Sequence, residues 1–181
     1  MRLFFFILLL ATGSFSKAQT RIYATNTGQI RFRSDAPMEL IDVNSKELKG
    51  AIDPAKRTFA FRIRIKSFDG FNSRLQKEHF NENYMESEKI PEATFSGKII
   101  EEVDFTKPGS YTIRAKGILN IHGVEQERII KCEVDVSENK IRIKSIFPVL
   151  LSDHNIPIPR VVKEKLANEV KVEVFAELLI K

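Results

Sequence analysis

Ser152, Asp153 and His154 are the residues that most resemble a catalytic set, and they stand side by side. A hydrolase triad uses the same residue types, but its side chains must converge in one hydrogen-bonded relay. Consecutive side chains on an extended segment point in alternating directions, so we do not expect a relay here. The sequence also lacks the G-x-S-x-G motif that presents a serine nucleophile. We interpret residues 152–154 as a polar turn.

The histidines, His79, His122 and His154, are scattered along the chain without a cysteine partner or an i, i+4 pair. A zinc site needs three or four ligands that converge on the ion, and this spacing offers none. The sequence therefore predicts no metal centre and no cofactor. We expect His122 and His154 to be hydrogen-bonded or solvated. The glutamates of residues 78–92 are interpreted as a solvated face, with no acid/base pair among them.

A short helix is expected over residues 75–84. Ser73 and Gln76 have the spacing of a capping box, in which each side chain satisfies a backbone donor at the helix start. Pro91 prevents the helix from continuing, and a strand is expected from Thr94 onward. His79 flanks the helix face that should press on the rest of the domain, where it could meet a ligand headgroup.

The remainder of the chain reads as short strands separated by turns. Apolar and polar residues alternate over residues 59–66, which predicts a strand with one buried and one solvated face. A second, short helix is considered at residues 161–167. The other predicted strands cover residues 21–25, 29–34, 48–53, 94–100, 110–121, 130–136, 140–144 and 170–180. Many short strands at this spacing favour a sandwich or a closed barrel.

The N-terminus has the features of an export signal. Arg2 precedes an apolar run at residues 3–11, and small residues at Ser16 and Ala18 suit a signal peptidase. We expect cleavage near Ala18, so that residues 1–18 are a signal peptide and residues 19–181 form one domain, exported to the periplasm or secreted. The apolar run is shorter than the roughly 20 residues that span a bilayer.

The composition sets further limits on function. The formal net charge is +5, but the basic residues are interleaved with acids, which does not favour a nucleic-acid partner. Cys132 is the single cysteine, so no intramolecular disulfide can form. The alternation of Ile130, Cys132, Val134 and Val136 predicts that the thiol is buried as a small apolar group.

The aromatic composition is unusual, because the chain has fourteen phenylalanines and no tryptophan. An eight-stranded barrel has an interior that is either filled or able to hold one ligand, and phenylalanines would suit an acyl or isoprenoid chain. From the residues alone, both a filled core and a cavity remain open. The phenylalanines that follow residue 18 are Phe32, Phe59, Phe61, Phe68, Phe71, Phe80, Phe95, Phe105, Phe147 and Phe175.

Three stretches together resemble the YceI-like family of exported bacterial proteins. They are Arg74, His79, Phe80, Tyr84 and Met85, then KIPEATF at residues 89–95, then GILNIHGV at residues 117–124. Residues 27–35 depart from the family, which often carries a histidine there. The resemblance implies a mainly β, antiparallel, lipocalin-like barrel of about eight strands with one or two short helices. It also implies an apolar tunnel that binds a polyisoprenoid or another long-chain amphiphile.

These arguments lead to a non-enzymatic carrier for a polyisoprenoid or fatty-acyl lipid, with transient membrane contact and no nucleic acid among its partners. Arg74 and His79 are expected at a headgroup, because a guanidinium suits phosphate or carboxylate. The expected ligand-binding residues in the wall are Phe59, Phe61, Ile63, Phe80, Phe95, Ile113 and Val172. The alternatives are a filled structural or interaction domain linked to stress, and an enzyme acting on lipid or a small carbonyl compound.

Overall fold

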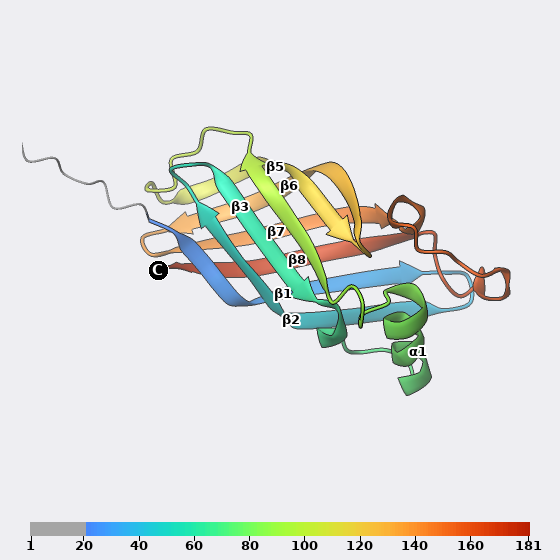
Figure 1. Cartoon of the computed structure of the whole chain (residues 1–181). Coiled ribbons are helices and arrows are strands. Elements are labelled where there is room, and N and C mark those ends of the chain that lie inside the picture. The colour runs from blue at the N-terminus through green and yellow to red at the C-terminus, as the bar shows by residue number, and fades with distance from the viewer. Residues whose placement is uncertain (1–20) are drawn as a thin grey trace, which may run out of the picture.

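The computed structural model describes residues 21–181. Eight antiparallel strands pair in chain order and β8 pairs with β1, which closes a barrel (Figure 1). The strands are β1 (Tyr23–Asp35), β2 (Leu40–Asp53), β3 (Thr58–Arg64), β4 (Glu92–Ile99), β5 (Gly109–Ile121), β6 (Val124–Ser137), β7 (Lys140–Leu150) and β8 (Glu169–Ile180). The predicted fold class is confirmed. The predicted signal peptide lies outside the described residues.

Side-chain alternation explains which face of each strand turns inward. Phe59 and Ile63 on β3 are buried, whereas Arg64 on the same strand is exposed. The predicted inward stripe of β6 is confirmed too, because Ile130, Cys132, Val134 and Val136 are all buried. Period-2 patterning therefore places one face of each strand in the barrel interior.

The turn expected between the predicted strands 21–25 and 29–34, at residues 26–28, does not form. β1 runs without interruption from Tyr23 to Asp35 and passes Gly28 with irregular register toward both neighbouring strands. The Thr27 backbone N–H donates to Thr25 Oγ1 at 3.3 Å inside this irregularity. A β-bulge accommodates one extra residue and bends the strand. Turn-forming residues therefore mark a bend in one long strand here.

Several predicted strands have different bounds. β6 begins at Val124 instead of residue 130, and β7 extends to Leu150 instead of residue 144. β2 begins at Leu40 instead of residue 48, because its first half pairs with β1 through Val43 opposite Phe32. The polar run from Asn44 to Glu47 conceals this half in the sequence, and tertiary pairing overrides weak local propensity. β3 ends at Arg64, and Ile65–Ser67 form a 3-10 turn instead of the predicted strand end.

The segment between β3 and β4 contains the predicted helix. α1 spans Arg74–His79 and continues into a π-helical turn, η2, at Phe80–Tyr84. Ser73 Oγ accepts from the Gln76 backbone N–H at 3.1 Å, while Gln76 Oε1 accepts from the Asn72 N–H at 2.9 Å. Both side chains therefore cap the helix start as the spacing predicted, although Gln76 reaches one residue further back than in the standard box.

The second predicted helix, residues 161–167, does not form as such. A 3-10 turn, η4, covers Arg160–Val162, and turns follow it. This region belongs to the long connection between β7 and β8, in which a 3-10 turn, η3, at Leu151–His154 comes first. Its backbone is held by other segments, since the Ala167 N–H donates to Ser34 Oγ on β1 at 2.9 Å. Tertiary hydrogen bonds replace a helical ladder here.

The two ends of the barrel differ in what covers them (Figure 1). One end carries the start of β1, the C-terminus and the connections β2–β3, β4–β5 and β6–β7. The other end carries the β1–β2 turn, the segment with α1, the β5–β6 turn and the long β7–β8 loop. The irregular segments that could border an opening therefore gather at one end.

Candidate functional site

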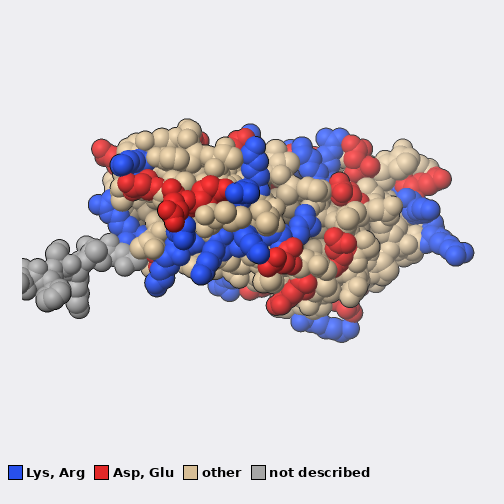
Figure 2. Space-filling model, turned by 90° about the horizontal axis from the view of Figure 1, so that it is seen from above, with Lys and Arg blue, Asp and Glu red and all other residues tan. Residues whose placement is uncertain are grey.

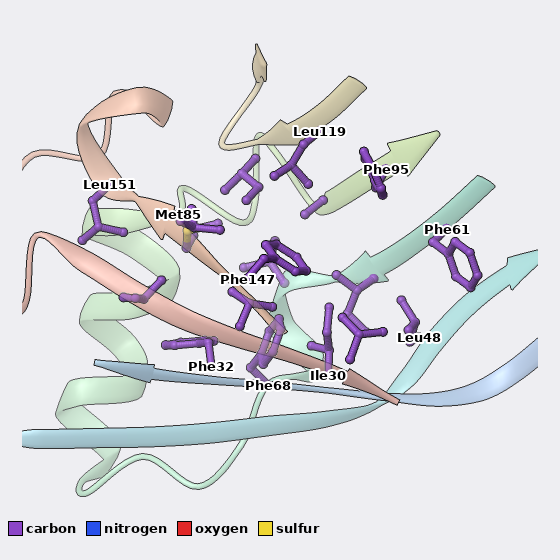
Figure 3. A pocket seen from close by; sticks show the side chains of 18 of the residues that line it. Ile30, Phe32, Leu48, Phe61, Phe68, Met85, Phe95, Leu119, Phe147 and Leu151 are labelled. Atoms are coloured by element: carbon purple, nitrogen blue, oxygen red, sulfur yellow. The ribbon is translucent and has the colours of Figure 1, made fainter. Parts of the chain in front are cut away.

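The barrel interior contains a cavity of about 540 Å³. This volume lies within the range of roughly 300–1,000 Å³ that small-molecule sites occupy. Side chains from opposite walls of the barrel point into the same space (Figure 3). Inward-facing residues of a filled core would be fully buried, yet Phe32, Phe147 and Val172 are only half-buried. These three side chains border the cavity, which leaves their inner faces accessible to a small molecule.

On the β7–β8 side the cavity stops before the end of the barrel that carries the C-terminus, whereas on β2 and β4 its wall reaches Ile52 and Ile99. On β7 its wall includes Ile143, Phe147 and Val149, but it excludes Ile141, which is fully buried. On β8 it reaches Ala176 and excludes Leu178. Side chains that fill the closed end include Tyr23, Val134, Val136, Ile141 and Leu178. The opening therefore lies at the end that carries α1.

Phenylalanine dominates the wall. Eight of the ten phenylalanines in the described residues border the cavity: Phe32, Phe59, Phe61, Phe68, Phe71, Phe80, Phe95 and Phe147. Phe59 on β3 packs diagonally against Phe95 on β4, with ring centroids 4.8 Å apart. Phe105 is buried away from the cavity wall, and Phe175 is half exposed on the outer face. The lining suits a ligand without polar groups along its length.

A cluster of four phenylalanines holds the helical segment over the opening. Phe80 stacks on Phe32 with centroids 5.5 Å apart, and it packs against Phe71 at 5.0 Å and Phe68 at 6.0 Å. Phe32 and Phe68 also meet edge to face at 5.2 Å. Aromatic pairs in these geometries stabilise beyond their buried area. The cluster therefore fixes α1 and η2 to the barrel while contributing its own faces to the cavity.

Polar groups concentrate at the opening, which we call the mouth. Glu39, Ser73, Gln76, His79 and Lys165 border it. Glu39 Oε1 accepts from Gln76 Nε2 at 2.8 Å, which joins the β1–β2 turn to α1. The mouth thus offers both donors and acceptors to a ligand headgroup.

Ser145 is a polar side chain in the deeper wall, and its hydroxyl is already satisfied. Ser145 Oγ donates to the Lys131 carbonyl oxygen at 2.7 Å. A buried hydroxyl with a partner carries little further demand for a ligand contact. The interior of the cavity therefore suits the apolar part of a ligand, while the polar side chains at the mouth could bind its polar headgroup.

One close approach in the wall requires glycine. A Cβ built on Gly50 of β2 would lie 2.0 Å from Cδ1 of Phe61, its partner across the β2–β3 pair. Any side chain at residue 50 would therefore displace the Phe61 ring. The absence of a Cβ at Gly50 leaves the room that this ring occupies beside β2.

The structure brings together eight of the nine predicted site residues. The cavity is bordered by Phe59, Phe61, Ile63, His79, Phe80, Phe95, Ile113 and Val172. Arg74 is outside the cavity wall: its side chain is 92% exposed, and its Nε lies 2.9 Å from Glu78 Oε1. Whether these residues bind a ligand remains a prediction. Their geometry places all of them except Arg74 where such a ligand would lie.

Several cavity residues were missed by sequence reasoning. Phe147 could have been found, because it continues the alternation of Ile141 and Ile143 on β7. Met85 and Leu151 lie in irregular segments without periodicity, and only the fold brings them to the cavity (Figure 3). Leu119 on β5 has an alternating pattern but no feature that separates it from ordinary core.

Residues 152–154 form a turn, as predicted. His154 is fully buried, so it is hydrogen-bonded and not solvated: its Nδ1 lies 3.2 Å from the Val124 carbonyl oxygen. His122 is mostly buried as well, with Nδ1 3.1 Å from the His154 carbonyl oxygen. Burial lowers the pKa of His154. These two histidines join the β5–β6 turn to the β7–β8 loop.

Cys132 is buried as predicted, and it also borders the cavity. Burial raises the pKa of its thiol. Within residues 21–181, no group of three or more His, Cys, Asp or Glu side chains has the arrangement of a metal site. None of the helices in the same residues combines the length and hydropathy of a membrane-spanning helix.

A family model described as the YceI-like domain matches residues 11–178. The chain belongs to the YceI-like family. This membership confirms the resemblance drawn from the three sequence stretches, and it extends over nearly all of the chain. A search of curated protein sequences finds no significant match.

Solved structures share the YceI-like fold at low sequence identity. A polyisoprenoid-binding domain from Saccharophagus degradans, implicated in plant cell wall breakdown, has a TM-score of 0.75 and 13% identity over 90% of this chain and 100% of its own. Burkholderia cenocepacia BcnA has a TM-score of 0.68 and 16% identity over 83% and 95% of the respective chains. The YceI protein of Campylobacter jejuni has a TM-score of 0.61 and 18% identity over 78% and 85%.

Proposed function

We propose that this YceI-like protein is a non-enzymatic carrier that holds one long apolar chain, a polyisoprenoid or fatty-acyl lipid, inside the barrel. The cavity of about 540 Å³ is the observation that carries this proposal, since apolar side chains form nearly all of its interior wall. The polyisoprenoid-binding domain of Saccharophagus degradans, which has the same fold, supports the same ligand class.

The energetics suit such a ligand. Burying one methylene group is worth about 0.8 kcal/mol, so a chain of about ten carbons supplies ample driving force without polar contacts. Affinity should therefore increase with chain length and depend little on headgroup chemistry. The polar mouth, with His79 and Gln76, would leave a headgroup accessible at the open end. The ligand would lie with its tail toward Ile113 and its polar end toward α1.

We also propose that the carrier works in the periplasm or outside the cell. The leader-like character of residues 1–18 supports this location. The mass of the protein recovered from the periplasmic fraction or the medium tests it, with Gln19 expected as the first residue. An intact N-terminus on a cytoplasmic protein would contradict it.

Native mass spectrometry of protein purified without detergent, followed by organic extraction, tests the carrier function. We expect a discrete added mass that extracts as a prenyl or acyl lipid. A bare protein mass that stays unchanged after incubation with long-chain lipids would instead favour a structural or interaction domain.

A matched pair of variants locates the ligand. Phe61→Asp places a carboxylate in the cavity wall, whereas Phe175→Asp places the same change on the outer face of β8. With folding verified by circular dichroism, lipid should be lost from the first variant and retained by the second. Equal retention in both would place the ligand elsewhere. A loss of catalytic turnover on a lipid substrate in His79→Ala, with binding retained, would revive the enzyme hypothesis.

A further inference from the structure

Three segments at the mouth are joined by hydrogen bonds into one surface. The Met38 backbone N–H donates to the Glu164 carbonyl oxygen at 2.9 Å, which joins the β1–β2 turn to the β7–β8 loop. Asn72 Nδ2 donates to the Leu40 carbonyl oxygen at 3.0 Å, just before α1. With the Glu39–Gln76 hydrogen bond, these contacts fix the position of all three segments around the opening. We call this surface the mouth face.

Large apolar side chains on the mouth face point into solvent. Val161 is 88% exposed, Met38 is 65% exposed and Leu75 is 58% exposed. Each comes from a different one of the three joined segments. Leu75 also borders the cavity, so exposed apolar surface continues into the apolar interior. Exposed apolar side chains on three joined segments, with one of them bordering an apolar cavity, are typical of an interaction surface.

Basic side chains accompany these apolar groups. Arg160, Lys163 and Lys165 lie in the same loop as Val161, with Glu164 as the single acidic residue of residues 160–166. Among the ion pairs formed within residues 21–181, none involves these three cations. Basic side chains project, beside acidic ones, from the end of the molecule at the right of Figure 2, where Figure 1 places this loop.

We propose that the mouth face docks on an anionic phospholipid bilayer, with Val161, Met38 and Leu75 entering the interface and Arg160, Lys163 and Lys165 facing lipid phosphates. Exposed apolar groups flanked by cations are the combination that holds a protein at an anionic lipid interface. In this orientation the cavity opens toward the bilayer, so an apolar chain passes between them without crossing water. The inference rests on the proposed carrier function and adds its route of exchange.

Vesicle flotation tests the docking. The full mature chain is mixed with vesicles of phosphatidylcholine alone, or of equal parts phosphatidylcholine and phosphatidylglycerol. We expect binding to the anionic vesicles and little to the neutral ones, with binding weakened by high salt. Arg160→Glu combined with Lys163→Glu should weaken binding at least about tenfold, because two attractive charges become repulsive. Val161→Asp should also weaken it.

Matched variants on the barrel wall provide the control. Lys131→Glu combined with Lys144→Glu makes the same charge change on β6 and β7, and Ile129→Asp makes an apolar-to-acid change at a side chain that is 57% exposed. These variants should keep near-normal vesicle binding. An equal loss in the wall variants and the mouth variants would overturn the inference, because it would show attraction by net charge alone.

The lipid content of each variant is measured in the absence of vesicles. This measurement separates docking on the bilayer from lipid binding in the cavity. Mouth variants that keep lipid but lose vesicle binding support the inference. Wild-type protein that carries lipid but ignores anionic vesicles overturns the docking and leaves the carrier function intact. Protein that takes up no lipid, even after incubation with long-chain lipids, refutes the carrier function and the proposed route of exchange, whether or not it binds the vesicles. A Val161-dependent dimer in light scattering, without vesicle binding, would assign the mouth face to a second copy and also overturn the inference.

Discussion

Phe32 of β1 and Phe80 of the π-helical turn stack with ring centroids 5.5 Å apart and an interplanar angle of 26°. This contact joins residues that are far apart in the sequence, and it attaches the helical segment to the barrel at the edge of the cavity. The same two rings serve stability and cavity shape, because both also border the empty space. Changes at this contact should therefore affect both properties.

Phe80→Ala should lower the free energy of unfolding by about 2–3 kcal/mol, somewhat less than for a fully buried phenylalanine. The loss arises because three aromatic neighbours, Phe32, Phe68 and Phe71, lose their shared partner. Chemical denaturation measures it, and hydrogen exchange should show faster opening of α1. Phe175→Ala, at a half-exposed ring on the outer face, is the control and should cost less than about 1 kcal/mol. Equal losses would contradict a structural role for the cluster.

Ala115→Leu should be tolerated if the barrel is hollow. Ala115 is buried and borders the cavity, so the added carbons would enter open space and not a packed core. Overpacking a filled core costs about 1–3 kcal/mol. We expect a smaller cost for Ala115→Leu, together with weaker binding of long chains. Val134→Phe, at the filled end of the barrel, should show the full penalty. A similar penalty for both would indicate a filled interior.

Stability should depend on pH through His154. Burial holds the pKa of His154 below its usual value of about 6.5, so the unfolded chain binds the proton more readily. The free energy of unfolding is therefore fully retained above about pH 6.5 and decreases as the pH falls toward the lower folded pKa. Thermal denaturation between about pH 8 and about pH 5 measures this dependence.

His154→Gln should flatten the pH profile in this window, even if it lowers the melting temperature throughout. Carboxylates act at lower pH: a hydrogen bond from Arg31 lowers the pKa of Asp42, and one from Arg114 lowers that of Glu101. Their contributions are lost only as the pH falls below the usual carboxyl range. An unchanged slope above pH 5 in the variant would show that another group is responsible.

Gly97→Ala should destabilise the barrel by at least about 2 kcal/mol. Gly97 on β4 lies opposite Gly117 on β5, and a Cβ on Gly97 would lie 2.1 Å from the Lys116 carbonyl oxygen. Backbone atoms cannot move aside as a flexible side chain can, so the two strands would have to separate. Denaturant titration measures the loss. Ser96→Ala, the exposed neighbour on β4, should change stability by less than about 0.5 kcal/mol, and a comparable loss there would refute the steric explanation.

Cys132 should react slowly with a bulky charged thiol reagent in the native protein. The thiol is buried in the wall, and burial raises its pKa, so little thiolate is available at neutral pH. The same reagent should label the protein rapidly in denaturant. Rapid native labelling would show that water reaches this depth of the cavity.

Much of the fold follows from local pattern. The alternation in β3, β6 and β8 predicted their buried faces, and the Ser73–Gln76 spacing predicted the start of α1. Where prediction failed, long-range pairing prevailed over local signals. Gly28 resembled a turn but lies in a bulge, and residues 40–47 of β2 looked too polar for a strand until paired with β1. Neither outcome could be deduced without knowing which strands are neighbours.

The sequence by itself determined that this chain forms a mainly β domain with one capped helix, because side-chain period and capping chemistry are local properties. It also identified some of the apolar side chains that border the cavity, such as Phe59, Phe61 and Ile63, because they alternate along a single strand. Only the tertiary structure decided that the interior is hollow at one end and filled at the other. That outcome depends on how strands, phenylalanine rings and the helical segment pack at long range. Packed volume is a property of the whole assembly of side chains, and no single stretch of sequence encodes it.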